Sequence, residues 1–198
     1  MRVVLASQSP ARLATLRNAG LDPEVVVSGV DESVVTLPDP AELSVELARL
    51  KARAVAVGFD DALVIGCDSV LEFGGVIHGK PGTADVAAQR WRAMRGSSGV
   101  LHTGHCVIDT RDGREVARSA DTVVHFADLG DDEIDAYVAT GEPLNVAGAF
   151  TIDGLGGAFV TGIEGDPHTV VGIGLPLLRT MLADLEIPWH SLWVHAER

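Results

Sequence analysis

The stretch VVLASQSPARLATL, residues 3–16, carries the chain from an apolar strand directly into a helix. Its apolar start indicates a short buried strand over residues 2–6. Ser9 is a typical N-cap residue and Pro10 suits the first position of a helix, so a helix is expected to begin there. Asn18-Ala19-Gly20 is a typical C-cap and is expected to end that helix. A strand that passes at once into a helix indicates an α/β protein.

Strands and helices continue to alternate along the rest of the chain. Strands are expected over residues 23–30 and 62–73, with a hairpin over 98–126 that turns at Asp112-Gly113. Helices are expected over residues 40–58, 83–95, 131–140 and 175–185. The other segments are an acidic loop (31–40), a turn and loop (74–85) and a glycine-rich run of short strands and tight turns (147–174). Because hairpins interrupt the alternation, the predicted fold is α/β with a mixed sheet flanked by helices, in a single domain over residues 1–198.

The bulk composition excludes some classes of partner. The chain has 198 residues, of which 46% are hydrophobic and 22% are charged, and its formal net charge is -13. A protein this acidic is repelled by nucleic acids and by anionic membrane surfaces, so neither is expected as a partner. No segment approaches the ~18 consecutive apolar residues of a membrane span, and the first residues lack the pattern of a secretory signal. We therefore expect a cytoplasmic protein in which Cys67 and Cys106 are buried, reduced thiols.

Ser7, Ser9 and Arg12 surround the start of the first expected helix. The N-terminus of a helix presents unpaired backbone N–H groups and a partial positive charge, which suit an anion. Two hydroxyl donors and a guanidinium one turn into the helix would complete a phosphate site. The alternative is that Ser9 only caps the helix and that Arg12 is a solvated surface residue. The chain contains no G-x-x-x-x-G-K-[ST] motif.

Two acidic residues are candidates for catalysis or metal binding. Asp68 interrupts the apolar strand at VIGC-D-SVL, where an unpaired buried carboxylate would be costly. It needs a metal, a cation or a reacting proton there, or it is a strand-end residue that accepts hydrogen bonds from backbone N–H groups. Glu32 lies in an acidic loop, where it is either the companion acid or a solvated side chain. Two such carboxylates, together with phosphate oxygens and water, suit Mg²⁺ or Mn²⁺.

Lys51 and Lys80 are the only two lysines of the sequence, against 13 arginines. A compact ammonium and a planar guanidinium are not interchangeable, so the two positions that carry lysine are candidates for a specific role. Lys51 lies among apolar residues of the expected 40–58 helix, and Lys80 lies between Gly79 and Pro81. The alternative for each lysine is an ordinary surface charge.

Nine short motifs, taken in order, extend over almost the whole chain. They are L-A-S-x-S-P-x-R (5–12), D-E (31–32), L-A-x-x-K-A (47–52), G-x-D-S (66–69), G-K-P (79–81), T-G (103–104), G-E-P (141–143), A-G-A-F (147–150) and V-V-G-x-G-L-P-L (170–177). Each motif is weak alone, but their order and spacing together are specific. The sequence resembles the Maf family of nucleoside triphosphate pyrophosphatases.

The resemblance implies a fold, a reaction and a role for each candidate residue. The implied fold is an elongated mixed sheet flanked by helices, with two lobes around a central nucleotide cleft, as in Maf and ITPase-like proteins. The implied reaction is metal-dependent hydrolysis between the α- and β-phosphates, which gives a nucleoside monophosphate and pyrophosphate. Asp68 and Glu32 are the implied catalytic residues, with Asp68 as the proton acceptor for the attacking water, and both are the implied ligands of Mg²⁺ or Mn²⁺. Asp68 acts there either as a free base or as a metal ligand that activates the water. The implied contacts to the triphosphate are Ser7, Ser9, Arg12, Lys51 and Lys80.

Two positions depart from the family pattern. The family often has two consecutive arginines after S-P, whereas this chain has Ala11 at the first, so one family contact to phosphate is missing or replaced. The branch that favours thymidine and uridine triphosphates usually has glutamine where this chain has Asp153, in A-G-A-F-T-I-D-G. A carboxylate accepts hydrogen bonds but cannot donate them, so we expect Asp153 to bind substrate with a different base preference. Residues 163–172, IEGDPHTVVG, are closer to the branch that takes methylated guanosine triphosphate.

The resemblance also implies a homodimer and a role in clearing non-standard or excess nucleotides, with a link to cell-division arrest. The alternative function is a regulatory nucleotide-binding protein of cell division without turnover, which would keep Arg12, Lys51 and Lys80 but would not need Asp68. A phosphatase that releases orthophosphate stepwise is a further alternative. It would share the metal and the cations, and only its products would differ.

Overall fold

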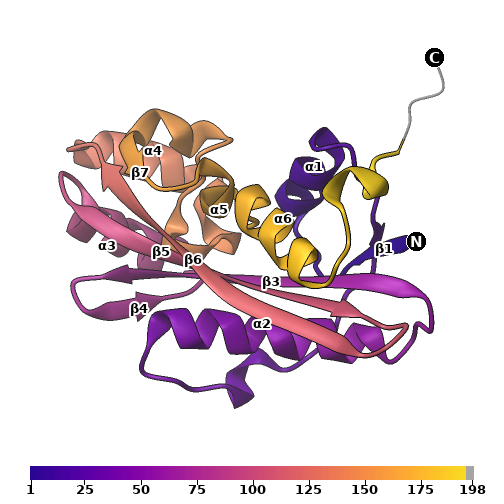
Figure 1. Ribbon diagram of the computed structural model, residues 1–198. Coiled ribbons are helices and arrows are strands. Elements are labelled where there is room, and N and C mark those ends of the chain that lie inside the picture. The colour runs from indigo at the N-terminus through magenta and orange to yellow at the C-terminus, as the bar shows by residue number, and fades with distance from the viewer. Residues whose placement is uncertain (195–198) are drawn as a thin grey trace. The chain divides into compact units, whose positions relative to one another are not determined.

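The computed structural model describes residues 1–194, and Figure 1 labels its helices and strands. The strands are β1 (Arg2–Leu5), β2 (Glu24–Val25), β3 (Ala62–Phe73), β4 (Val76–His78), β5 (Ser98–Asp109), β6 (Arg114–Phe126) and β7 (Val160–Glu164). The α-helices are α1 (Pro10–Asn18), α2 (Pro40–Ala56), α3 (Ala84–Met94), α4 (Asp131–Ala139), α5 (Pro167–Val171) and α6 (Leu175–Asp184). The 3₁₀ helices are η1 (Glu32–Val34), η2 (Glu142–Asn145), η3 (Ala147–Ala149), η4 (Leu155–Phe159) and η5 (Trp189–Leu192).

The strands form a mixed seven-stranded sheet among the described residues, in the order β2-β1-β3-β5-β6-β7, with β4 paired to β3. β1 pairs in parallel with β2 and β3, whereas β4 and β7 pair antiparallel with β3 and β6. The predicted α/β fold with a mixed sheet and flanking helices is thereby confirmed. The single domain expected over residues 1–198 stays a prediction.

The chain divides into two compact units. The first unit contains residues 1–68, 103–120 and the segment from Gly172, and the second contains residues 69–102 and 121–171. Three strands, β3, β5 and β6, therefore contribute residues to both units.

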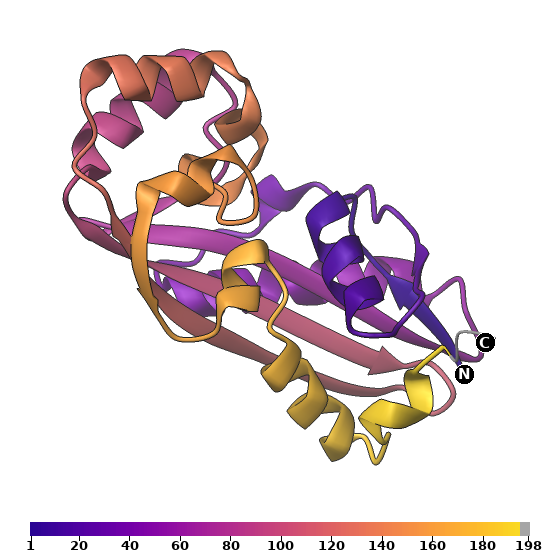
Figure 2. The ribbon, with the colours of Figure 1, turned by 90° about the horizontal axis from the view of Figure 1, so that it is seen from above.

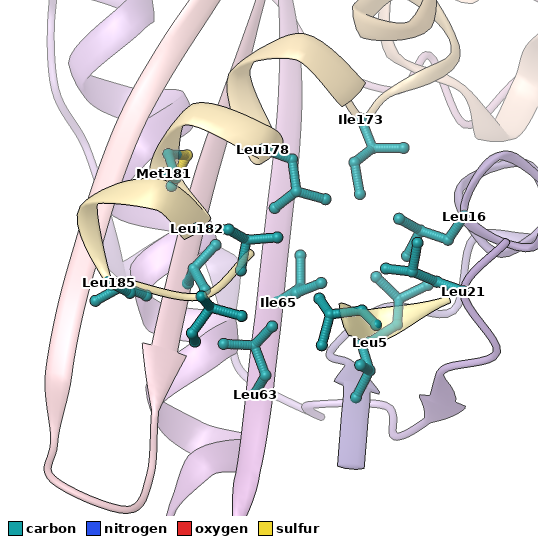
Figure 3. Close-up of a cluster of buried hydrophobic side chains, with 14 of the residues drawn as sticks. Leu5, Leu16, Leu21, Leu63, Ile65, Ile173, Leu178, Met181, Leu182 and Leu185 are labelled. Atoms are coloured by element: carbon teal, nitrogen blue, oxygen red, sulfur yellow. The ribbon is translucent and has the colours of Figure 1, made fainter. Parts of the chain in front are cut away.

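Side chains of the first unit alternate between the two faces of its strands, as the pleat of a strand requires. One buried apolar cluster contains Leu5 of β1, Ile65 of β3, Leu16 of α1 and Leu178 of α6 (Figure 3). The other contains Val4 of β1, Val64 of β3 and Ala48 of α2. Odd-numbered residues of β1 and β3 thus contact α1 and α6, and even-numbered ones contact α2. Figure 1 shows α2 on one side of β3, with α1 and α6 on the other.

The second unit has an aromatic core. Trp91 of α3 is fully buried and makes edge-to-face contacts with Tyr137, Phe126 and Phe159. Its indole N–H donates to the carbonyl of Ala149 at 2.7 Å, so the polar end of the ring is satisfied as well. α3 and α4 pack side by side over this core (Figure 2).

Three element predictions were incomplete. The strand expected over residues 23–30 shrinks to the two residues of β2, because β2 pairs only with Val4 and Leu5 before β1 ends. The segment 74–85 was expected as a turn and loop, but it includes strand β4. Gly74 and Gly75 both have positive φ, which allows the tight hairpin between β3 and β4. Helix α5 lies inside the segment expected to contain only short strands and turns.

No helix of residues 1–194 combines the length and apolarity that a membrane crossing requires.

Candidate functional site

The turn between β1 and α1 is organised by two serine hydroxyls. Ser9 caps α1, because its Oγ accepts a hydrogen bond from the backbone N–H of Arg12 at 3.4 Å. Ser7 is buried, and its Oγ accepts from the backbone N–H of Ser9 at 3.1 Å and from Arg12 Nη1 at 3.4 Å. The expected start of α1 at Pro10 is confirmed, and the three predicted phosphate-site residues lie together in one turn.

Arg12 also holds two backbone segments that are distant in sequence. Its Nε donates to the carbonyl of Gly172 at 2.8 Å, and its Nη1 donates to the carbonyl of Cys67 at 2.9 Å. A side chain at Gly172 would put a Cβ 2.9 Å from Arg12 Nε, and the φ of +113° there also favours glycine. This bridging role was not predicted from the sequence, and the glycine of the V-V-G-x-G motif is the available signal for it.

Glu32, Lys51 and Asp68 form a charged triad in the first unit. Lys51 Nζ lies 2.5 Å from Asp68 Oδ1 and 2.9 Å from Glu32 Oε1. The side chains of Lys51 and Asp68 are 10% and 12% exposed, whereas that of Glu32 is 46% exposed. The buried carboxylate of Asp68 is therefore paired with the buried ammonium of Lys51. The triad as a whole contains two acidic side chains and one basic side chain.

Glycines let helix α2 bring Lys51 to the strand. A Cβ at Gly66 of β3 would lie 2.4 Å from the carbonyl oxygen of Ala48, and one at Gly104 of β5 would lie 2.2 Å from that of Ser44. No residue with a side chain fits such a contact without a shift of the backbone. The glycines of the G-x-D-S and T-G motifs therefore set the close packing of α2 against β3 and β5.

The two cysteines lie beside this site without taking part in it. Cys67 is fully buried between Gly66 and Asp68, and burial raises the pKa of its thiol to about 11. Burial likewise raises the pKa of Cys106 to about 12. Both remain protonated thiols near neutral pH and are poor nucleophiles, which agrees with the expected reduced state.

Lys80 and Asp153 belong to the second unit, and both are exposed. The loop that carries Lys80 is held at Gly79, whose carbonyl accepts from Arg90 Nη1 at 2.6 Å and from the backbone N–H of Gly148 at 3.3 Å. Neither Lys80 nor Asp153 makes a side-chain ion pair or hydrogen bond with any of residues 1–194. The loop that carries Asp153 is held by Glu142, which was not among the predicted site residues.

The first unit thus combines a helix N-terminus, two hydroxyls, an ammonium and two carboxylates. The carbonyl of Cys67, which Arg12 binds, belongs to the residue next to Asp68, so the α1 turn adjoins the triad. Residues 1–194 contain no cluster of three or more His, Cys, Asp or Glu side chains arranged for a metal ion. Any ion held by Glu32 and Asp68 would therefore need further ligands from a substrate or from water.

The sequence matches the family described as Maf-like protein over residues 2–185. A nucleoside triphosphate pyrophosphatase of Salinispora tropica is 61% identical over 198 residues, which cover 98% of this chain and 88% of that protein. A protein of the same name from Streptomyces coelicolor is 59% identical, over 99% of this chain and 96% of its own. Among solved structures, the Ham1 protein of Staphylococcus aureus aligns with 65% of this chain and 73% of its own, at 16% identity and a TM-score of 0.46. Because the family match spans nearly all of the sequence, this chain belongs to the Maf-like protein family.

Proposed function

We propose that this protein hydrolyses nucleoside triphosphates between the α- and β-phosphates, releasing a nucleoside monophosphate and pyrophosphate. The observation that carries the proposal is the buried Asp68 carboxylate, paired with Lys51 and Glu32 next to the N-terminus of α1. The names of the close relatives support the same reaction class. An acid, a cation and an anion-binding turn within one compact unit are the parts that phosphate hydrolysis needs.

The α1 turn supplies the phosphate site in this proposal. The backbone N–H groups at the start of α1 and the hydroxyls of Ser7 and Ser9 bind phosphate oxygens, and the helix dipole favours the negative charge. Arg12 keeps the turn in place through its bonds to the carbonyls of Cys67 and Gly172 and adds positive charge. Lys51 and Lys80 neutralise further phosphate charge.

Asp68 accepts the proton of the attacking water. A general base must have its charged form available and its oxygen fixed within hydrogen-bond reach of the water. Lys51 meets the second need, because its Nζ lies 2.5 Å from Asp68 Oδ1 and holds that oxygen in place. The other oxygen, Oδ2, is the atom that takes the proton.

The family implies a divalent metal ion, Mg²⁺ or Mn²⁺, and Glu32 and Asp68 fit such an ion. Both carboxylates contact the same Lys51 Nζ, so they lie close to each other, and beside the ammonium they would offer a metal ion an all-oxygen donor set. Mg²⁺ is commonly held by one or two carboxylates, with phosphate oxygens and waters completing its coordination. When bound, the ion would polarise the phosphate and help to neutralise its charge.

Asp153 selects the base. A carboxylate accepts hydrogen bonds from ring N–H and amino groups, whereas the glutamine of the thymidine- and uridine-selective branch can also donate. We therefore propose a preference for bases that present donors, with methylated guanosine triphosphate among the candidates, and a role in clearing non-standard nucleotides. The homodimer implied by the family stays a prediction.

Product analysis tests the proposal. Purified protein is incubated with Mg²⁺ or Mn²⁺ and a panel of canonical and methylated nucleoside triphosphates, and the products are separated. Monophosphate and pyrophosphate are expected, while Asp68→Asn should bind nucleotide without turnover. Diphosphate and orthophosphate would indicate a stepwise phosphatase instead. Binding without turnover by the unmodified protein would favour a regulatory nucleotide-binding protein.

A further inference from the structure

The carboxylate of Glu142 collects hydrogen bonds from four donors in the second unit. Its Oε1 accepts from the hydroxyl of Tyr137 at 2.9 Å, from Thr151 Oγ1 at 2.5 Å and from the backbone N–H of Gly156 at 3.0 Å. Its Oε2 accepts from the backbone N–H of Leu155 at 3.0 Å. A carboxylate with both oxygens occupied in this way is fixed in position.

The backbone around Glu142 is equally constrained. Gly141 has a φ of +78°, Pro143 fixes the next φ, and the backbone N–H of Glu142 donates to Thr140 Oγ1 at 3.2 Å. Tyr137 is packed edge-to-face against Trp91, and its burial raises its pKa, so its hydroxyl stays a donor at neutral pH. Burial alone would raise the pKa of Glu142, but the bonds from Thr151, Gly156, Leu155 and Tyr137 together hold it below the usual range.

Two glycines leave room for the carboxylate. A Cβ at Gly154 would lie 2.7 Å from Glu142 Oε2, and one at Gly156 would lie 2.4 Å from the hydroxyl oxygen of Tyr137. Both distances are far below an ordinary carbon–oxygen contact, so these two positions of the I-D-G-L-G-G sequence must be glycine for the loop to pack against Glu142 and Tyr137. The G-E-P motif and the loop over residues 151–156 are therefore joined by hydrogen bonds and packed closely against each other.

The Glu142 carboxylate holds the loop by hydrogen bonds on both sides of Asp153. Thr151 lies two residues before it and Leu155 two residues after it, and both bind the same carboxylate. Asp153 is left at the exposed tip, and its carboxylate has no hydrogen-bond partner within residues 1–194. We propose that Glu142 is a positioning residue for base selection, which holds the Asp153 carboxylate ready for the donors of a nucleobase. This inference rests on the proposed function, in which Asp153 contacts the base.

The test measures base discrimination in Glu142→Gln. The amide of glutamine cannot accept at both oxygen positions, so at least one donor of the loop faces another donor whichever way the amide turns. The ratio of kcat/KM between the best and the worst base of the panel is expected to fall by about 10-fold, mainly because KM for the preferred base rises. Loss of one hydrogen bond to a charged group typically changes an equilibrium constant by about that factor. Glu133→Gln is the matched control, since Glu133 caps α4 at Gly130 through one comparable bond and should leave the ratio unchanged.

Asp153→Asn separates a positioning effect from a general structural one. If Glu142 acts through Asp153, Glu142→Gln should lower the ratio no further in the Asp153→Asn background. An equal loss of kcat/KM for every base, or an additive effect in the double variant, would overturn the inference. Should Glu142→Gln fail to fold, Thr151→Ala removes one donor only and is expected to lower the ratio in the same direction.

Amide hydrogen exchange distinguishes failure of the inference from failure of the proposed function. The backbone N–H groups of Leu155 and Gly156 should exchange at least ~10-fold faster in Glu142→Gln than in the unmodified protein. Unchanged exchange would overturn the anchoring by itself, whatever the activity. If the unmodified protein binds nucleotides without turnover, the same ratio is measured as dissociation constants. If it neither binds nor hydrolyses any of them, both the function and the inference fail.

Discussion

Lys51 shows how one residue can make a buried acid tolerable. Removing a carboxylate and an ammonium from water costs several kcal/mol each, and their attraction offsets this only with close geometry. Lys51 Nζ meets that condition with two partners, the buried Asp68 and the half-exposed Glu32. The choice of lysine follows, because its compact ammonium can approach two carboxylates at once without the planar fork of arginine.

Replacement of Lys51 by methionine should therefore destabilise the protein. The change keeps most of the side-chain volume but leaves the Asp68 carboxylate buried without its cation, at a cost of roughly 3 kcal/mol in the free energy of unfolding. Chemical denaturation at neutral pH measures this, with Lys80→Met as the matched control at an exposed lysine, expected within ~0.5 kcal/mol of the unmodified protein. Adding Asp68→Asn to Lys51→Met should restore stability, and a double variant as unstable as the single one would contradict the pairing.

Asp68→Asn by itself tests the chemical role of the carboxylate. The amide is of the same size but cannot accept the proton of water, so kcat should fall by about 10³-fold, within the range typical for loss of a general base. The dissociation constant for the nucleotide should change much less, because the α1 turn and the lysines remain. Isothermal titration of the variant with the preferred nucleotide measures binding, and steady-state assays measure kcat. A kcat within a few-fold of the unmodified enzyme would exclude Asp68 as the base.

At the scale of elements, the packing of α2 against β3 and β5 depends on missing side chains. Gly66 and Gly104 allow backbone contacts that any Cβ would block, and these contacts place Lys51 opposite Asp68. Gly66→Ala should lower the free energy of unfolding by ~2 kcal/mol or more, because overpacking forces backbone shifts. It should also lower kcat by displacing Lys51. Gly58→Ala is the control, since its Cβ would lie 3.5 Å from the carbonyl oxygen of Val55, an ordinary contact, and thermal melting compares the two. Equal melting temperatures would contradict the close packing.

The same elements indicate how far the fold could be predicted from sequence. Helix α2 and strand β3 were predictable because long periodic or apolar segments carry strong signals, and β3 appears with the expected bounds. The length of strand β2 was not, because Val25 and Val27 both look like strand residues, although both are exposed and Val27 lies outside the strand. Its length depends on how far β1 continues, which is a tertiary property. The β3–β4 hairpin could have been predicted, since Gly74-Gly75 is a turn signal between apolar residues.

At the scale of the whole molecule, the residues of the candidate site could be named from the sequence, but the contacts between them could not. The sequence pointed to Ser7, Arg12, Glu32, Lys51 and Asp68, and the structure brings these residues together in the first unit. The pairing of Asp68 with Lys51 and the Glu142 anchor of the Asp153 loop had no local sequence pattern, and the bond from Arg12 to Gly172 had only the glycine of the V-V-G-x-G motif as a signal. Each joins residues from different elements, and such contacts are set by the fold rather than by neighbouring residues.

Acid should destabilise the protein through carboxylates whose charged form the fold favours. Asp109 is fully buried and accepts hydrogen bonds from the side chain and backbone of Arg111, and the Arg111 side chain is the largest cause of its lowered pKa. Hydrogen bonds from Ser33 and Arg114 lower the pKa of Asp31 and Asp112 in the same way. A carboxyl group with a lowered pKa in the folded state stabilises the protein above its unfolded pKa, which is about 3.9 for aspartate. That contribution is lost as the pH falls through the lower, folded value.

These aspartates are therefore expected to lower the free energy of unfolding as the pH falls below about 4. The buried Asp109 adds up to about 1.4 kcal/mol per pH unit to the slope, because the unfolded chain then binds a proton that the folded chain does not. Asp109→Asn should lower stability at pH 7 and make the decline below pH 4 shallower, since one linked proton is removed. Urea denaturation between pH 3 and pH 7 measures both effects, with the exposed carboxylate of Asp60 replaced by asparagine as the control. If Asp109→Asn keeps the slope of the unmodified protein below pH 4, the stabilising charge lies elsewhere and the Arg111 pair contributes nothing to acid sensitivity.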